Sequence, residues 1–227
     1  NPPILVFSPA RSGRTGESKD TYKNVKEVAE VVINVVTYNM VQQMSLASSP
    51  FPKGVDEFVK TGFTPIESEL VKPARVKESP VQLECVVENI IELGQEGGAG
   101  NLIICKVVKM HIQENALNEH GQIDQTKIDL VARMGGDWYC RANGEALFEL
   151  AKPLTICGIG VDALPEHIRL SHILTGNDLG KLGNVEEAPS HESSTEIKTK
   201  YAGQDSILVA KELLNKDLAK EALALLW

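Results

Sequence analysis

No stretch of the 227-residue chain approaches the run of about eighteen apolar residues that a membrane helix needs, and no signal segment opens it. We therefore expect a globular protein of the cytoplasm that spans no membrane. The length and the 42% content of hydrophobic residues suit one sizeable domain, or one domain plus an appendage. Because the chain begins at Asn1 and enters a strand-like run almost at once, the sequence also predicts that its start is missing.

Closely paired cysteines and an excess of basic residues are also absent. The four cysteines are widely spaced without a C-x-x-C pair, which is typical of reduced, mostly buried thiols; a disulfide is the alternative. They are Cys85, Cys105, Cys140 and Cys157. The formal net charge of -8 and the pI near 5.2 argue against nucleic acid as a partner, because proteins that bind its backbone present a basic face.

The common phosphate and metal motifs are missing as well. A Walker A loop fails because Ser18 stands where the motif needs glycine and Asp20 follows Lys19. This excludes a P-loop nucleoside triphosphatase, and the same loop contains no G-x-G-x-x-G. No H-E-x-x-H occurs, and His167 and His172 are five positions apart, off a common helical face, so the sequence predicts no metal site.

What the sequence does contain is a local excess of positive charge near its start. Five cations and two anions lie between Ser8 and Lys26: Arg11, Arg14, Lys19, Lys23 and Lys26 against Glu17 and Asp20. Hydroxyl groups interleave with them, from Ser8, Ser12, Thr15, Ser18 and Thr21. A helix that starts near Asp20 can also point free amides at an anion. These features favour a small anion, most simply a phosphate; the alternative is a solvated surface loop.

The first third of the chain is expected to alternate between strands and helices. Apolar spacing and capping residues predict a strand over 3–7, a helix from Asp20 as its N-cap, a strand over 31–36, a helix over 39–47 and one or two helical turns over 54–60. The second helix is expected to stop near Ser48 and Ser49. The order of strand, polar loop and helix places the cationic loop at a helix N-terminus.

From Val81 onward the pattern is typical of antiparallel β-structure. Two β-rich runs, 81–92 and 102–112, are joined by the glycine-rich stretch 94–100 and predict a long hairpin. A third run over 128–133 ends at a glycine pair. Strands joined by hairpins, with helices inserted between them, favour a mainly antiparallel barrel over a parallel doubly wound sheet.

The C-terminal part is expected to hold a linker and one amphipathic helix. The predicted organisation is a barrel domain over 1–182, a flexible polar linker over 183–205 and a helix over 206–227. The leucines of that helix need a partner surface, which the domain itself or a second copy of the chain would supply.

Three segments resemble the flavin reductase-like, FMN-binding split-barrel family. They read SGRTGESKDTYKNVKEVAEVVINVV, ASSPFPKGVDEFVKTGFTPIESELVKPARVKESPVQLEC and VARMGGDWYCRA, in order between Ser12 and Ala142. The resemblance implies a mainly β fold, a Greek-key split β-barrel with inserted helices and a C-terminal helix. It also implies a homodimer with FMN bound non-covalently near the interface. The N-x-A-P-F-S stretch that clasps the ring in the family is absent from this chain.

The resemblance also implies a set of cofactor-binding residues. The KDT segment, Lys19 to Thr21, would hold the flavin phosphate, with Asp20 capping the helix. The strand end at Phe7 and Ser8 would lie along the cofactor. Arg14 and Ser18 would add charge and a hydroxyl group. Ser48 and Ser49 would lie near the flavin; their alternative role is the polar stop of a helix.

The chemistry implied by FMN is hydride transfer from NADH or NADPH, which needs no catalytic side chain. Three functions stay open: a flavin reductase that releases reduced flavin or hands it to a flavin-using partner protein, a non-enzymatic FMN electron carrier, and a family scaffold without activity. Glu84, Glu88 and Glu92 could form an acid–base set, but the solvent face of a sheet explains them more simply. Arg133 and Tyr139 would lie by the active site in the family; alternatively they are a surface cation and a packed aromatic.

Overall fold

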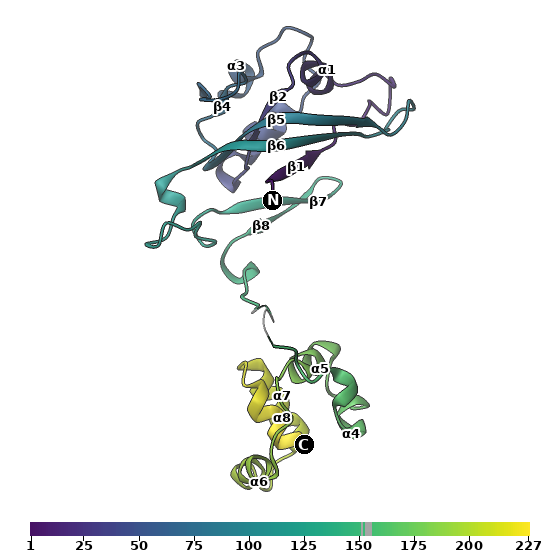
Figure 1. Cartoon of the computed structure of the whole chain (residues 1–227), viewed down its shortest axis with the longest axis vertical. Helices are drawn as coiled ribbons and strands as arrows, with labels where there is room; N and C mark the ends of the chain where they lie inside the picture. The colour runs from purple at the N-terminus through teal and green to yellow at the C-terminus, as the bar shows by residue number, and fades with distance from the viewer. Residues whose placement is uncertain (151, 153–155) are drawn as a thin grey trace. The chain divides into compact units, whose positions relative to one another are not determined.

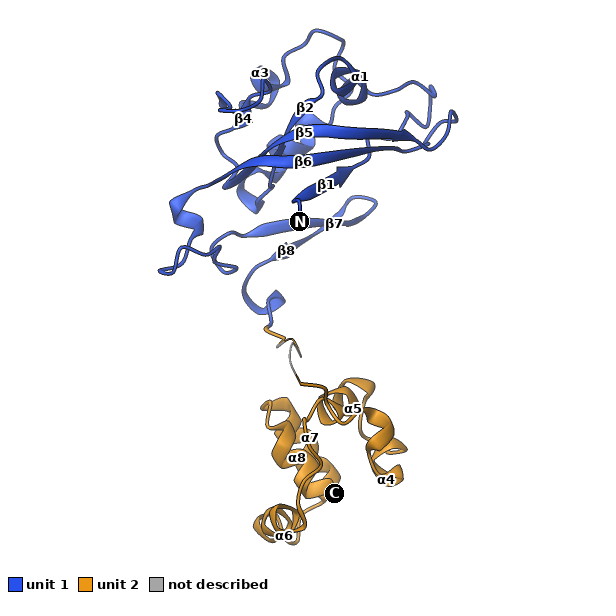
Figure 2. Ribbon diagram, in the orientation of Figure 1, with its two compact units in different colours: residues 1–148 blue, residues 149–227 orange. Residues whose placement is uncertain are grey.

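The computed structural model of the chain describes residues 1–150, 152 and 156–227. It contains two compact units, unit 1 (Asn1–Phe148) and unit 2 (Glu149–Trp227) (Figure 2). The boundary thus differs from the one expected after residue 182. No helix in these described residues is long and apolar enough to cross a membrane.

An antiparallel sheet of four strands forms the frame of unit 1 (Figure 1). Its order is β1 (Ile4–Phe7), β6 (Asn101–Ile112), β5 (Val81–Glu92) and β2 (Glu30–Asn34). The predicted hairpin is therefore confirmed as β5 and β6, with twelve residues in each strand. One face of the sheet carries a core cluster built from Val25, Cys85, Ile103 and Cys105.

The helices of unit 1 follow the predicted order. Helix α1 (Asp20–Glu27) packs Val25 into the core cluster, and α2 (Val41–Ala47) follows a short 3-10 turn at Tyr38–Met40. Helix α3 (Glu57–Thr61) covers part of the predicted turn at 54–60, and a small hairpin of β3 (Pro65–Ile66) and β4 (Arg75–Val76) comes next.

A second hairpin closes unit 1. Strands β7 (Leu130–Gly135) and β8 (Trp138–Ala142) turn at the predicted glycine pair, where Gly135 and Gly136 both adopt positive φ angles. The two strands of this hairpin pair with each other, and the bridge between Thr37 and Leu130 joins the hairpin to the segment before α2.

The expected barrel is only partly matched. Within the described residues the strands form one sheet of four and two pairs rather than a closed barrel. Helices also contain more residues than strands, so the mainly β description is not supported. The reason lies in unit 2, whose regular elements are all helical.

Unit 2 has its own hydrophobic core. Its helices are α4 (Glu166–Arg169), α5 (Gly176–Gly183), α6 (His191–Lys200), α7 (Ser206–Asn215) and α8 (Ala219–Leu226). Fully buried Leu182, Leu214 and Leu223 come from three of these helices and belong to one cluster.

The polar segment expected to be a flexible linker contains helix α6. Ser190 caps α6 by accepting from the Ser193 amide at 3.1 Å, and Ile197 packs against the unit 2 core. The single C-terminal helix is also divided, because Asp217 with φ of 57° separates α7 from α8. Helix α6 is short and contributes one apolar side chain to the core, so its composition resembles that of a linker. This is why the sequence pattern does not reveal the helix.

Candidate functional site

The cationic loop of residues 8–19, called the anion loop below, connects β1 to α1 and is folded by its own polar groups. The Ser12 amide donates to the Glu17 carbonyl at 2.8 Å, and the Gly16 amide returns to the Ser12 carbonyl at 2.8 Å. The Ser12 hydroxyl accepts from the Thr15 amide at 3.2 Å. Ser12 therefore shapes the loop, in addition to any role toward a ligand.

The N-terminus of α1 offers unpaired amides. Lys19 occupies the N-cap position in extended geometry, with no side-chain cap, and its carbonyl accepts from Tyr22 and Lys23 at 3.1 and 3.3 Å. Within the described residues the amides of Asp20 and Thr21 have no acceptor. An uncapped helix start of this kind is a ready site for an anion.

The predicted role of Asp20 as the helix cap is wrong. Asp20 is the first helical residue, and its carboxylate lies 3.0 Å from the Lys23 ammonium one turn later. Because the Asp20 carboxylate pairs with Lys23 and does not accept from the N-terminal amides of the helix, these amides stay open to a ligand.

Most of the residues predicted to hold FMN lie at this end of unit 1. Arg14, Lys19 and Thr21 are exposed, and Ser18 lines a shallow surface hollow of about 500 Å³ together with Tyr22. Of the other predicted residues, Phe7 is half-buried against the core cluster and Ser8 is exposed at the end of β1. Ser49 is half-buried and follows α2. The anion loop therefore presents a hydroxyl and two cations around the start of α1.

Ser48 belongs to a different cleft. It lines a cavity of about 450 Å³ between α2 and the β7–β8 hairpin, whose other walls include Tyr38, Arg133, Tyr139 and Arg141. The Ser48 hydroxyl donates to the Met44 carbonyl at 3.3 Å, as expected of a polar helix stop. The structure thus does not bring Ser48 together with the anion loop in one pocket, although it does unite Ser48 with Arg133 and Tyr139.

Arg141 is locked into the wall of this second cleft. Its guanidinium forms two bonds to the Asp129 carboxylate, at 2.7 and 2.8 Å, and lies 3.9 Å from the centre of the Tyr38 ring. The bonds from Arg141 hold the pKa of Asp129 below its usual range. The stacked pair gives the cleft a rigid aromatic and cationic wall.

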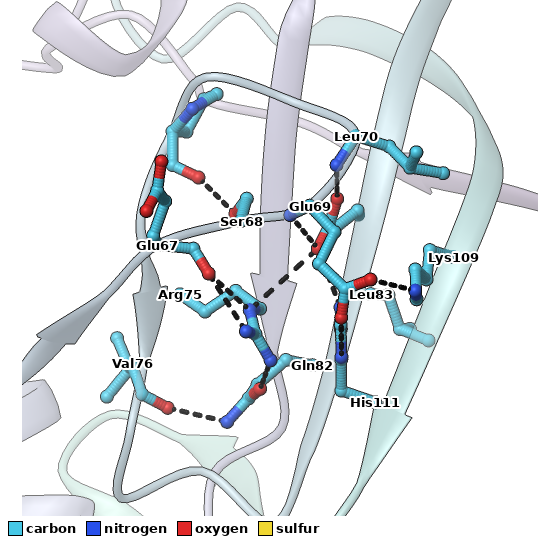
Figure 3. Close-up of polar contacts among 12 residues, drawn as sticks. Glu67, Ser68, Glu69, Leu70, Arg75, Val76, Gln82, Leu83, Lys109 and His111 are labelled. Carbon is cyan, nitrogen blue, oxygen red and sulfur yellow. Dashed lines mark hydrogen bonds and ion pairs between the residues drawn. The ribbon is translucent and has the colours of Figure 1, made fainter.

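At the end of the sheet away from the β5–β6 turn, a carboxylate that the sequence pattern places on the solvent face is buried in a network of hydrogen bonds (Figure 3). Glu84 on β5 is fully buried and accepts from the amides of Glu69 and Leu70 at 2.9 and 2.6 Å. The His111 ring on β6 donates from Nε2 to the same carboxylate at 2.6 Å. Glu88 and Glu92 are exposed, so the predicted solvent face holds for two of the three acids.

The loop between β3 and β4 buries Glu84. Cys85 belongs to the core cluster, so its neighbour Glu84 faces the other side of the sheet. There residues 67–72 cover the carboxylate, and the amides of Glu69 and Leu70 donate to it. Arg75 reinforces this cover by donating to the Glu67 carbonyl at 2.8 Å and to Gln82 at 3.1 Å (Figure 3). The network is thus a structural clasp between the β3–β4 hairpin and the sheet.

The remaining reactive side chains form no further site in the described residues. No group of three or more metal-binding side chains occurs there. Cys85 and Cys105 are buried free thiols, and burial raises the pKa of Cys85 to about 11, which makes it a poor nucleophile. Cys140 and Cys157 are exposed free thiols, so the expectation of mostly buried cysteines holds for two of the four.

Comparison with known proteins identifies the family. The family model for a flavin reductase like domain matches residues 1–127, and the chain belongs to the flavin reductase-like family. A relative from Halalkalibacterium halodurans is 34% identical over 154 residues, which cover 67% of this chain and 72% of the relative. The match to the family model ends before the β7–β8 hairpin, so this hairpin and unit 2 lie outside the part of the chain that the model covers.

Solved structures agree with this assignment. Component B of nitrilotriacetate monooxygenase from Bacillus cereus is 33% identical with a TM-score of 0.60, over 66% of this chain and 73% of that chain. Flavoredoxin of Desulfovibrio vulgaris is 23% identical with a TM-score of 0.56, over 68% of this chain and 75% of that chain, and shows the fold alone. The neighbours include a split-barrel protein from Shewanella frigidimarina, 27% identical over 67% of this chain and 72% of that chain, with a TM-score of 0.56.

The Glu84 clasp predicts a pH dependence of stability. Burial alone would raise the pKa of Glu84, but the bonds from Glu69, Leu70 and His111 lower it from 4.5 to about 2. Because the pKa is lower in the folded state, the ionised carboxylate adds about 3 kcal/mol to the free energy of unfolding above pH 4.5. This contribution is lost as the pH falls towards 2. We expect Glu84→Gln to lose about this much in urea unfolding at pH 7.

The difference between wild type and Glu84→Gln should shrink as the pH is lowered from 4.5 to 2. Glu88→Gln, which changes an exposed acid on the same strand, is the control and should follow the wild-type curve. A Glu84→Gln protein as stable as wild type at pH 7 would refute the role assigned to the clasp.

Proposed function

We propose that this chain binds FMN non-covalently and works as a flavin reductase that takes a hydride from NADH or NADPH. Membership of the flavin reductase-like family supports the class of cofactor. The observation that carries the proposal for this chain is the uncapped start of α1, where two unpaired amides lie beside exposed Lys19 and Thr21.

The residues at this helix start fit a phosphate group. The unpaired amides of Asp20 and Thr21 lie at the N-terminal end of the helix, where the helix dipole favours negative charge. Lys19 adds a flexible point charge and Thr21 adds a hydroxyl donor, while Arg14 and Ser18 can complete the set from the loop. The acidic net charge of the chain makes this cationic end the natural place for a dianion.

When bound, FMN supplies the ring that accepts the hydride. The chain then has to hold the phosphate and orient the ring, and Phe7 and Ser8, which directly precede the anion loop, are proposed to lie along it. No side-chain acid or base is needed for this transfer. The second cleft, with Ser48, Arg133 and Tyr139, is proposed as a wall for the ring or the nicotinamide from a neighbouring copy.

A homodimer is part of the same proposal. One face of the sheet presents apolar side chains to solvent, with Ile4 and Val6 on β1 and Val86 on β5. Ile4 and Val86 both pair with Lys106, and paired residues of adjacent strands point to the same side, so the three side chains lie on one face of the sheet. A second copy of the chain would cover it and bring a second set of site residues close to the first.

The dimer is tested by light scattering on the whole chain at micromolar concentration. We expect the mass of two chains, and we expect Val6→Lys, which places a charge on the apolar face, to give mainly monomer. A wild-type monomer at this concentration would refute the dimer.

The phosphate site is tested by comparing FMN with riboflavin, which has the same ring and no phosphate. Hydrogen bonds to a charged group contribute roughly 1.5–3 kcal/mol, so Lys19→Ala and Thr21→Ala should each weaken FMN by about ten- to a hundredfold. Riboflavin affinity should hardly change in either variant. Equal losses for both flavins, or no loss for FMN, would show that the loop does not hold the phosphate.

Enzymatic activity is tested by steady-state oxidation of NADH and of NADPH with free FMN in excess. A flavin reductase consumes many equivalents of one or both nucleotides per chain. An FMN electron carrier, in contrast, is reduced once and needs a protein partner to turn over. Consumption limited to one equivalent would favour the carrier and contradict the reductase.

A further inference from the structure

The turn of the long hairpin lies directly against the anion loop. The Arg11 amide donates to the Ala99 carbonyl at 2.9 Å, and the Gly98 amide donates to the Arg11 carbonyl at 3.1 Å. At the base of the turn, buried Asn101 donates from Nδ2 to the Pro9 carbonyl at 2.9 Å. The loop is thus fastened through its backbone at two points to a segment some ninety residues later in the chain.

The Arg11 side chain extends this connection. Its guanidinium donates from Nη1 to the Gly16 carbonyl at 3.2 Å and from Nη2 to Gln95 Oε1 at 3.0 Å. The side chain is half-buried, whereas Arg14 and Lys19 are exposed. By its charge and position Arg11 is one of the cations of the predicted phosphate site, but its side chain bonds to the loop at Gly16 and to the turn at Gln95.

Glycine at position 97 allows the close approach. A Cβ atom there would lie 3.1 Å from the Ser12 carbonyl oxygen and 3.3 Å from the Gly13 carbonyl oxygen. Both are backbone atoms of the anion loop, so a side chain at 97 would have to displace the loop itself. A missing side chain is the usual way for two backbones to approach this closely.

The same hairpin also holds α1. Glu92, at the end of β5, accepts from the Tyr22 hydroxyl and from the Lys26 ammonium, the latter at 2.9 Å. These bonds, first from Lys26 and then from Tyr22, lower the pKa of Glu92 to about 2, so the acid is ionised at neutral pH. The anion loop and the helix that follows it are therefore set against one rigid frame.

We propose that Arg11, Gln95 and Gly97 are positioning residues that give the anion loop its phosphate-binding shape without touching the phosphate. The inference rests on the proposed function and adds that the site is set by the hairpin turn. Lys19 and Thr21 can meet a phosphate together only if the loop delivers them at a fixed place at the start of α1. The turn, through Arg11 and the close contact at Gly97, is what fixes that place.

The test uses neutral changes in the turn, which carry no charge into the site. Gly97→Ala pushes the turn against the loop backbone, and Gln95→Ala removes a partner of Arg11. We expect each to weaken FMN about three- to tenfold, through a loop shifted by a few tenths of an ångström, and to leave riboflavin affinity unchanged. The control is Glu96→Gln in the same turn, an exposed side chain, which should bind both flavins like wild type.

Measuring Lys19→Ala and the unfolding midpoint of each flavin-free variant separates the possible outcomes. If Lys19→Ala loses FMN affinity while Gly97→Ala and Gln95→Ala keep it, the positioning role is wrong and the proposed function stands. If the turn variants weaken both flavins alike and unfold at lower temperature, the turn is only structural and the inference fails. If Lys19→Ala binds FMN like wild type, the phosphate site and this inference both fail.

Discussion

The backbone ladder between β5 and β6 is the constraint on which unit 1 depends. Each of the two strands has twelve residues, and β1 and β2 complete the sheet on its two sides. The turn of this hairpin receives the anion loop, and Glu92 near the same turn holds α1. At its other end Glu84 and His111 hold the β3–β4 hairpin. One long hairpin thus fixes both the candidate phosphate site and the cover at the opposite end.

The two ends of the hairpin use different physical means. Near the turn, glycines without side chains and backbone bonds bring the anion loop close, which leaves Arg14 and Lys19 exposed for a ligand. At the far end a buried carboxylate satisfies two amides and a histidine at once. A buried charge is tolerated only when it is fully hydrogen-bonded. Removing one partner of Glu84 should therefore lower the free energy of unfolding far more than removing a side chain of the exposed anion loop.

The sequence was a good guide wherever a local pattern decides the structure. The strand, loop and helix order around Lys19 and the long hairpin from Val81 both follow from apolar spacing and turn residues. It failed where contacts between distant segments decide. Regular spacing places Glu84 with Glu88 on a solvent face, yet the loop between β3 and β4 covers and buries it. The sequence predicts that Arg11 contacts the phosphate, whereas in the structure its guanidinium donates to Gln95.

The division of the chain was difficult to predict for a related reason. The segment that forms α6 contains a single apolar side chain that reaches the unit 2 core, Ile197, so its composition is that of a linker. Ser48 shows the same limit within the candidate site. Its position after α2 was expected, but only the fold places it in a cleft with Arg133 and Tyr139 instead of beside the anion loop.

The claim that the start of α1 binds the flavin phosphate is tested most directly by amide chemical shifts. A ¹⁵N-labelled sample of the whole chain is titrated with FMN and, separately, with riboflavin. We predict that the amides of Asp20 and Thr21 shift strongly with FMN and stay in place with riboflavin. FMN that binds without moving either amide would contradict the account.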